Sequence, residues 1–338
     1  MRRAVLIAAL LLQACAVADA QAATSCRSVR LPVSLAAGTP ADGYVAGELC
    51  RPPGARTLQV LLSGATYGRA YWDPPVRSAA ASYVRMMRAS GSATLNLDRI
   101  GIGHSSHPPA ETVTVPAGAY VTHQVVQAAR AGAFGARFER VVAVGHSLGS
   151  AIALVEAATY QDVDGLIVSG LLAHAPPVGA PALVAALQPA QLEPRFGDRP
   201  PGYLTTRAGT RGEVLYAPGG AHPDVIALDE RTKETVTTGE LATLGEASQP
   251  WVDAAIRVPV LSVVGEFDNV FCPSSCAAPA SPAFAEARHY PGAPSFETFV
   301  LAGSGHVVNL HRQAPRWFAA ARRWLERLEA QRPGGRPR

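Results

Sequence analysis

The run Val141-Val-Ala-Val-Gly-His-Ser-Leu-Gly-Ser150 decides the fold of this chain. Its four apolar residues, 141–144, predict a short buried strand, and the run 151–158 predicts a helix directly after it. Between the two, Gly145-His-Ser-Leu-Gly149 fits Gly-x-Ser-x-Gly, a tight strand-to-helix turn that lifts the serine hydroxyl, here of Ser147, clear of the sheet. The pattern alone does not establish a reactive serine, because a serine hydroxyl reacts only when a base is positioned beside it. The alternative is a glycine-containing turn in another kind of α/β protein.

Apolar strand-like runs alternate with helical runs along most of the chain. This alternation predicts a mainly parallel eight-stranded sheet with helices on both faces. No helix separates the first two runs, so we expect them to form an antiparallel hairpin at the sheet edge. The expected strands are residues 29–35, 44–49, 58–62, 93–97, 141–144, 166–168, 260–264 and 297–301, and the expected helices are residues 76–89, 117–131, 147–160 and 315–330.

The alternation stops between residues 171 and 256, which are rich in proline and glycine at first and more charged later. A stretch of this length is rarely a bare loop, so we expect an inserted, partly helical cap over a site. Residues 21–170 and 257–331 are then expected to form the core. The tail, 332–338, has no large apolar side chain to bury and is expected to be disordered.

The N-terminus predicts export. Met1-Arg-Arg3 is followed by an apolar run, 4–12, and then by Ala18-Asp-Ala20, which together have the three parts of a signal peptide cleaved after Ala20. The apolar run is too short for a stable membrane span. Lipidation at Cys15 is the alternative, but Gln13 fits a lipoprotein cleavage box poorly. We therefore expect a secreted or periplasmic protein.

Composition and cysteine count agree with an exported globular protein. The formal net charge is only +4, and no basic stripe with interleaved aromatic residues occurs, so nucleic acid is not an expected partner. Four cysteines remain after cleavage, and an even number in an exported chain predicts disulfides. Three pairings are possible; Cys272 with Cys276 would close one loop, and Cys26 with Cys50 would join the first strand to the second. The spacing fits a four-cysteine zinc site poorly.

A catalytic serine needs a histidine base and an acid that orients it. Of nine histidines, only His306 lies in a glycine-containing loop directly after a late strand. Asp268 lies just beyond the C-terminal end of the expected strand 260–264, where catalytic groups of parallel sheets gather, with Glu266 as the nearest rival. The order Ser147, Asp268, His306 matches the serine-acid-histidine order of one class of hydrolases.

These residues together resemble the α/β-hydrolase fold superfamily, and the resemblance covers nearly the whole mature chain. Four local matches support it: the strand-to-helix turn 145–149 around Ser147, the loop 265–270 that contains Asp268, the segment 305–310 that contains His306, and the glycine-rich loop 98–105 after the expected strand 93–97.

The resemblance implies an oxyanion hole formed by two backbone amides. One belongs to Leu148, after the nucleophile, and the other to Ala65 by position, with Thr66 as the alternative. Ser63 stands where members of the superfamily usually carry histidine. The candidates for lining a substrate pocket are Thr66, Tyr67, Trp72 and His146, although aromatic residues in such loops also pack under a cap.

The function predicted from these residues is an exported serine hydrolase that cleaves a small carboxylic ester or lactone through an acyl-enzyme. An acyltransferase or amidase with the same triad is the alternative, and a non-catalytic binding protein of the same fold is a further one. We expect no cofactor, because Ser106 replaces the third glycine of a dinucleotide motif in 98–106. No metal is expected either; His104 and His107 are interpreted as solvated loop residues. The sequence indicates no oligomeric state.

Overall fold

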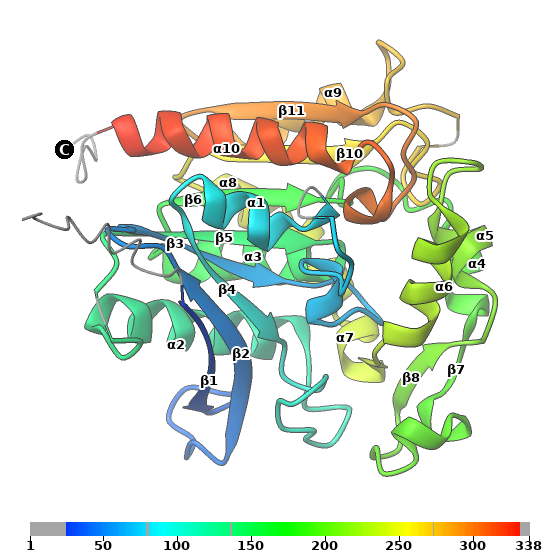
Figure 1. The fold of residues 1–338 in the computed structure, drawn as a ribbon, viewed down its shortest axis with the longest axis horizontal. Coiled ribbons are helices and arrows are strands. Elements are labelled where there is room, and N and C mark those ends of the chain that lie inside the picture. Colours follow the sequence, from blue (N-terminus) through cyan, green and yellow to red (C-terminus); the bar gives the residue numbers. More distant parts are fainter. Residues whose placement is uncertain (1–24, 79–80, 136, 273, 332–338) are drawn as a thin grey trace, which may run out of the picture.

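The computed structural model describes residues 25–78, 81–135, 137–272 and 274–331. Its main strands are β1 (Ser25–Val33), β2 (Gly43–Arg51), β3 (Thr57–Leu62), β4 (Ala93–Asp98), β5 (Arg140–His146), β6 (Gly165–Ser169), β10 (Val260–Gly265) and β11 (Phe296–Leu301). They form one eight-stranded sheet in the order β1-β2-β4-β3-β5-β6-β10-β11 (Figure 1). The pairs β1–β2 and β2–β4 are antiparallel, and the other pairs are parallel. The predicted mainly parallel sheet with an antiparallel edge hairpin is confirmed.

Helices cover both faces of the sheet. The longer ones are α1 (Tyr83–Ala89), α2 (Val115–Ala131), α3 (Leu148–Tyr160) and α10 (Ala314–Ala330). Helices α1 and α10 pack together on one face, while α2 and α3 pack together on the other (Figure 1). The helix expected over 76–89 begins only at Tyr83, because the Ser82 hydroxyl accepts a hydrogen bond from the backbone N–H of Arg85 and so caps the helix there.

Each face of the sheet has its own apolar core. On one face, Trp317 of α10 stacks on Tyr83 of α1 at 5.0 Å between ring centroids, and Phe318 meets the same ring edge-to-face at 5.4 Å. On the other face, the aliphatic residues of α2 and α3 pack on the sheet; Val125 and Ala151 are completely buried there. Apolar burial on both faces holds the strand ends in fixed positions, and these ends carry the candidate site.

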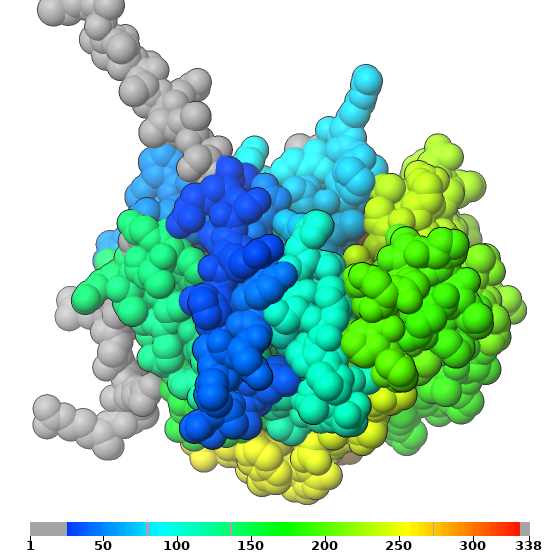
Figure 2. Space-filling view, turned by 90° about the horizontal axis from the view of Figure 1, so that it is seen from below, coloured from blue at the N-terminus to red at the C-terminus, as the bar shows by residue number. Residues whose placement is uncertain are grey.

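Residues 171–256, which lie between β6 and β10 and for which a cap is expected, are called the insertion below. It holds α4 (Ala180–Ala185), β7 (Leu187–Pro189), η3 (Ala190–Leu192), η4 (Pro194–Phe196), β8 (Tyr203–Thr206), α5 (Arg211–Leu215), α6 (Pro223–Thr232), β9 (Val236–Thr237), α7 (Thr238–Ala242), η5 (Leu244–Ser248) and α8 (Pro250–Ala255). Strands β7, β8 and β9 form a small antiparallel sheet. Most of the insertion forms a lobe at one end of the molecule, green to yellow-green in Figures 1 and 2. Its last elements, η5 and α8, pack against α3 instead.

The remaining short helices lie in connections: η1 (Arg69–Tyr71), α9 (Pro282–Ala285), η6 (Glu286–His289) and η7 (Val308–Leu310). Two disulfides join Cys26 to Cys50 and Cys272 to Cys276. The first links directly opposite residues of β1 and β2. No helix among the described residues is long and apolar enough to cross a membrane. The expected signal peptide, Cys15 and the tail 332–338 lie outside the described residues.

Candidate active site

Ser147 lies in a sharp turn between β5 and α3, as the Gly-x-Ser-x-Gly pattern predicts. Its backbone has φ of 51° and ψ of −116°, in the left-handed region that side-chain-bearing residues rarely adopt. A Cβ atom at Gly145 would lie 2.4 Å from the backbone nitrogen of Ser150, and one at Gly149 would lie 2.1 Å from the Leu62 carbonyl oxygen. Only glycine fits these two positions, so the turn holds the Ser147 hydroxyl at the end of the sheet.

Ser147, His306 and Asp268 come together although they are far apart in sequence. The Ser147 Oγ lies 3.0 Å from His306 Nε2, and both carboxylate oxygens of Asp268 lie 3.1 Å from His306 Nδ1. Asp268 is completely buried and His306 is 2% exposed. The carboxylate therefore faces Nδ1 without competition from solvent, and Nε2 is directed at the serine hydroxyl. This arrangement allows His306 to accept the Ser147 proton.

The rival acid, Glu266, lies elsewhere in the same loop. Its Oε2 accepts a hydrogen bond from the backbone N–H of Gly303 at 2.9 Å. The Cys272–Cys276 disulfide lies at the other end of this loop. The two cysteines also bind the loop backbone: the Cys272 N–H donates to the Asp268 carbonyl and the Cys276 N–H to the Glu266 carbonyl, both at 2.8 Å. Glu266 and the disulfide thus hold the backbone around Asp268, while Asp268 contacts the histidine.

The expected oxyanion donors lie on two segments that touch each other. A Cβ atom at Gly64 would lie 3.2 Å from the Ser147 Cβ, so the loop after β3 packs directly on the serine turn. Residues 64–67 form a β-turn closed by the Tyr67 N–H and the Gly64 carbonyl, with Thr66 at a φ of 61°. Neither the Ala65 nor the Leu148 backbone N–H donates a hydrogen bond to any described residue. Two free amides beside the nucleophile are what an oxyanion hole requires.

Ser63, the departure from the superfamily pattern, stabilises this turn. Its hydroxyl donates to the Tyr67 carbonyl at 2.7 Å. The buried guanidinium of Arg99 donates to the Ser63 and Gly64 carbonyls at 2.8 and 3.2 Å and pairs with Glu240 of the insertion. Side chains of the core and of the insertion therefore stabilise the turn that contains the Ala65 amide.

A second buried ion pair, which the sequence analysis missed, joins the insertion to the same turn. Arg211 is completely buried; its Nη1 lies 2.9 Å from the Thr66 Oγ1 and its Nη2 lies 2.8 Å from the Asp229 carboxylate. The hydroxyls of Tyr67 and Tyr216 donate to the other Asp229 oxygen at 3.0 and 2.9 Å. Burial raises the pKa of both tyrosines well above the usual value, so both remain donors. The left-handed backbone of Thr66 is thus fixed by a buried polar cluster, in which Arg211 Nε has no hydrogen-bond partner among the described residues.

We expect Arg211→Met to lower the free energy of unfolding by about 3–5 kcal/mol, because it leaves the Asp229 charge buried and uncompensated. Chemical denaturation measures the change. The double variant Arg211→Met with Asp229→Asn should recover most of the loss, since the asparagine oxygen still accepts from the two tyrosines. A single variant as stable as wild type would show that this cluster does not hold the insertion.

Two of the four expected pocket residues, Trp72 and His146, are buried against Tyr71. Trp72 is completely buried and packs on Tyr71 and Tyr83, so core packing accounts for its position. His146 is stacked on Tyr71 at 4.3 Å, and its ring lies 5.1 Å from the His306 ring. Burial, together with the nearby His306, lowers the pKa of His146 well below its usual value. His146 therefore stays neutral beneath the Tyr71 ring.

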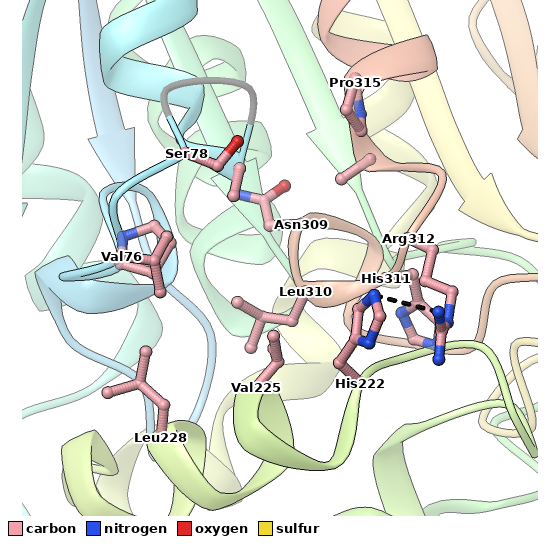
Figure 3. A pocket seen from close by; sticks show the side chains of 13 residues that line it. Val76, Ser78, His222, Val225, Leu228, Asn309, Leu310, His311, Arg312 and Pro315 are labelled. Atoms are coloured by element: carbon pink, nitrogen blue, oxygen red, sulfur yellow. Dashed lines mark hydrogen bonds between the residues drawn. The ribbon is translucent and has the colours of Figure 1, made fainter.

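A cavity of about 430 Å³ lies between the loop after β3, helix α6 and the segment that follows His306. Figure 3 shows Val225 and Leu228 of α6 pointing toward Leu310, so these walls are apolar. His222 and Arg312 border it at one side and are hydrogen-bonded to each other at 3.0 Å. Ser147, Asp268 and His306 are not among the described residues that line this cavity, but Leu310 belongs to the same loop as His306.

A family model described as "Alpha/beta hydrolase family" matches residues 59–321. Since this match covers more than half of the chain, the protein belongs to the alpha/beta hydrolase family. No curated protein matches the chain in sequence.

Solved structures of esterases and lipases share the fold at low sequence identity. A thermophilic esterase from Thermogutta terrifontis is 21% identical with a TM-score of 0.59, covering 89% of this chain and 99% of that one. A monoacylglycerol lipase from Paleococcus ferrophilus is 15% identical with a TM-score of 0.55, covering 85% and 99%. Est1E from Butyrivibrio proteoclasticus, solved with ferulic acid bound, is 15% identical with a TM-score of 0.55, covering 86% and 97%.

Proposed function

We propose that the protein is an exported serine hydrolase that cleaves small carboxylic esters, with Ser147 as nucleophile, His306 as base and Asp268 as the orienting acid. The observation that carries the proposal is the continuous set of contacts Ser147–His306–Asp268 at 3.0 and 3.1 Å. The esterase and lipase neighbours support ester bonds as the target.

The chemistry follows from these contacts. His306 Nε2 takes the hydroxyl proton as Ser147 Oγ attacks the ester carbonyl, and the amides of Leu148 and Ala65 stabilise the oxyanion that forms. His306 then gives the proton to the departing alkoxide, which leaves an acyl-serine and a free alcohol. Water, deprotonated by the same imidazole, then attacks the acyl-serine; the bond to Ser147 Oγ breaks, His306 returns the proton to Oγ, and the acid is released. Asp268 stabilises the transient imidazolium throughout.

The apolar cavity supports an organic acyl or alcohol group of moderate size as part of the substrate. Its walls come from Val225, Leu228 and Leu310, and none of the described residues that line it is acidic. Pockets of a few hundred Å³ with apolar walls are typical small-molecule sites. Because the cavity lies beside the loop of His306, its position supports the acyl or alcohol group of the ester as its occupant.

Export is proposed on two observations. The N-terminal sequence has the three parts of a signal peptide, with cleavage expected after Ala20. The two disulfides, Cys26–Cys50 and Cys272–Cys276, are of the kind that persists in oxidising compartments.

A panel of p-nitrophenyl esters with short, medium and long acyl chains, together with lactones and aryl amides, tests the proposal. We expect the purified mature protein to hydrolyse at least one class of ester with saturation kinetics and to leave the amides intact. Turnover of amides alone would indicate an amidase. Binding of esters without turnover would indicate a non-catalytic relative of the fold.

A further inference from the structure

One imidazole and two carboxylates form a cluster at the C-terminal end of α3, outside the candidate active site. His123 comes from α2, Glu156 from the end of α3 and Asp162 from the connection that follows. Helices α2 and α3 pack side by side (Figure 1). The chain turns at Gln161, whose φ is 50°, so that Asp162 faces the two helices. One ligand atom from each of the three residues lies within 4.8 Å of the other two.

The Glu156 carboxylate is the most informative member of the cluster. Its side chain is completely buried, and neither oxygen has a hydrogen-bond partner among the described residues. The Oδ1 of Asp162 has none either, while its Oδ2 accepts from His123 Nδ1 at 2.7 Å and Gln127 Nε2 at 2.5 Å. A buried carboxylate without a partner is costly, so this one requires a proton or a cation.

The charges around the cluster favour a cation. The last turn of α3 contains no basic residue, so the negative end of the helix dipole has no compensating side chain there. Arg130, a neighbouring cation, donates to the Asp162 backbone carbonyl and to the Asp164 carboxylate. Its hydrogen bonds thus go to groups other than the Glu156 and Asp162 carboxylates. Two carboxylates and a helix C-terminus meet with no cationic side chain hydrogen-bonded to them except His123.

We propose that His123, Glu156 and Asp162 bind a zinc ion. An imidazole with two carboxylates is a donor set that zinc accepts readily, whereas Ca²⁺ and Mg²⁺ prefer oxygen donors alone. The His123 and Asp162 side chains are 25% and 14% exposed, which leaves room for a water as fourth ligand and a path for entry. Stacking of the His123 ring on Tyr160 at 4.1 Å fixes the orientation of the imidazole.

The site is structural and independent of the proposed ester chemistry. Ser147 precedes the first residue of α3 and Glu156 lies near its last, so the rise of the helix separates them by roughly 14 Å. A zinc ion there ties the end of α3 to α2. Nothing in the sequence indicates this site, because the three residues share no short motif and meet only through the packing of α2 on α3.

Metal analysis of the full mature protein, produced without a polyhistidine tag, tests the proposal. The protein is stripped with a chelator, incubated with zinc chloride, desalted and measured by mass spectrometry of the metal, with calorimetric titration for affinity. We expect about one zinc per chain and a rise in Tm on zinc addition. Glu156→Gln and His123→Gln should each weaken zinc binding by about tenfold or more, and His104→Gln, which alters an exposed histidine, should not.

A proton shared between Glu156 and Asp162 is the competing explanation, and the same measurements separate the two. If a shared proton is the explanation, Glu156→Gln should keep the stability of the zinc-free protein, because the glutamine amide donates to Asp162 as the protonated carboxyl does. Failure of the wild type to bind stoichiometric zinc, or equal binding by His123→Gln, would overturn the proposal. If Glu156→Gln does not fold, His123→Gln, which alters a partly exposed side chain, decides the question.

Discussion

We expect Ser147→Ala to lower the kcat of ester hydrolysis by roughly 10⁶-fold, the loss that removal of a serine nucleophile causes when base and acid remain. The hydroxyl is the only group of Ser147 that reaches His306 Nε2, at 3.0 Å, and alanine offers no atom that can form the acyl intermediate. The fold should persist, because alanine keeps the Cβ atom and leaves both glycines of the turn in place. Steady-state kinetics on the best ester of the panel measures the change.

The matched control for this variant is Ser248→Ala, which removes an exposed hydroxyl from η5. We expect this control to keep the wild-type kcat and KM. Circular dichroism and thermal melting of both variants should overlay the wild type. If Ser147→Ala retained more than about a tenth of the activity, a different residue would have to be the nucleophile.

Asp268→Asn is expected to slow turnover by roughly 10⁴-fold, because the asparagine amide stabilises the wrong tautomer of the histidine. In the wild type both carboxylate oxygens of Asp268 lie 3.1 Å from His306 Nδ1, so that Nδ1 carries the proton and Nε2 is free to accept. An asparagine N–H donating to Nδ1 would place the proton on Nε2, which faces Ser147. Single-turnover kinetics measures the acylation rate.

Glu266→Gln is the control for the acid, since Glu266 lies in the same loop but bonds to the Gly303 amide. We expect this variant to keep most of the activity. A large loss in Glu266→Gln combined with a near wild-type rate in Asp268→Asn would transfer the acid role to Glu266. A loss of folding in both, seen as early melting, would be resolved by Asp268→Glu, which keeps a carboxylate in the loop.

The fold could be predicted from the sequence because its signals are local. Alternating apolar runs mark the eight strands within a few residues, and the five-residue pattern around Ser147 reports a turn that only two glycines allow. The geometry of Asp268 and His306 follows from the same logic, because both come directly after neighbouring parallel strands, β10 and β11, whose C-terminal ends share one edge of the sheet.

The supports of the site could not be predicted because they depend on contacts between distant parts of the chain. Arg211 meets Thr66 only when the insertion folds over the loop after β3, and nothing near either residue indicates the pairing. Arg99 belongs to a motif that was noticed for its glycines, yet its side chain holds the Ser63 and Gly64 carbonyls. Buried charges of this kind have no periodic signature, since their partners come from different elements.

Covalent labelling with a fluorophosphonate tests the central claim most directly. The mature wild-type protein is incubated with the probe, digested, and the modified peptide is sequenced by mass spectrometry. We expect one adduct per chain, located on Ser147, and no adduct in Ser147→Ala or in protein unfolded before the probe is added. Absence of labelling in the folded wild type, or an adduct on another residue, would contradict the assignment of Ser147 as the activated nucleophile.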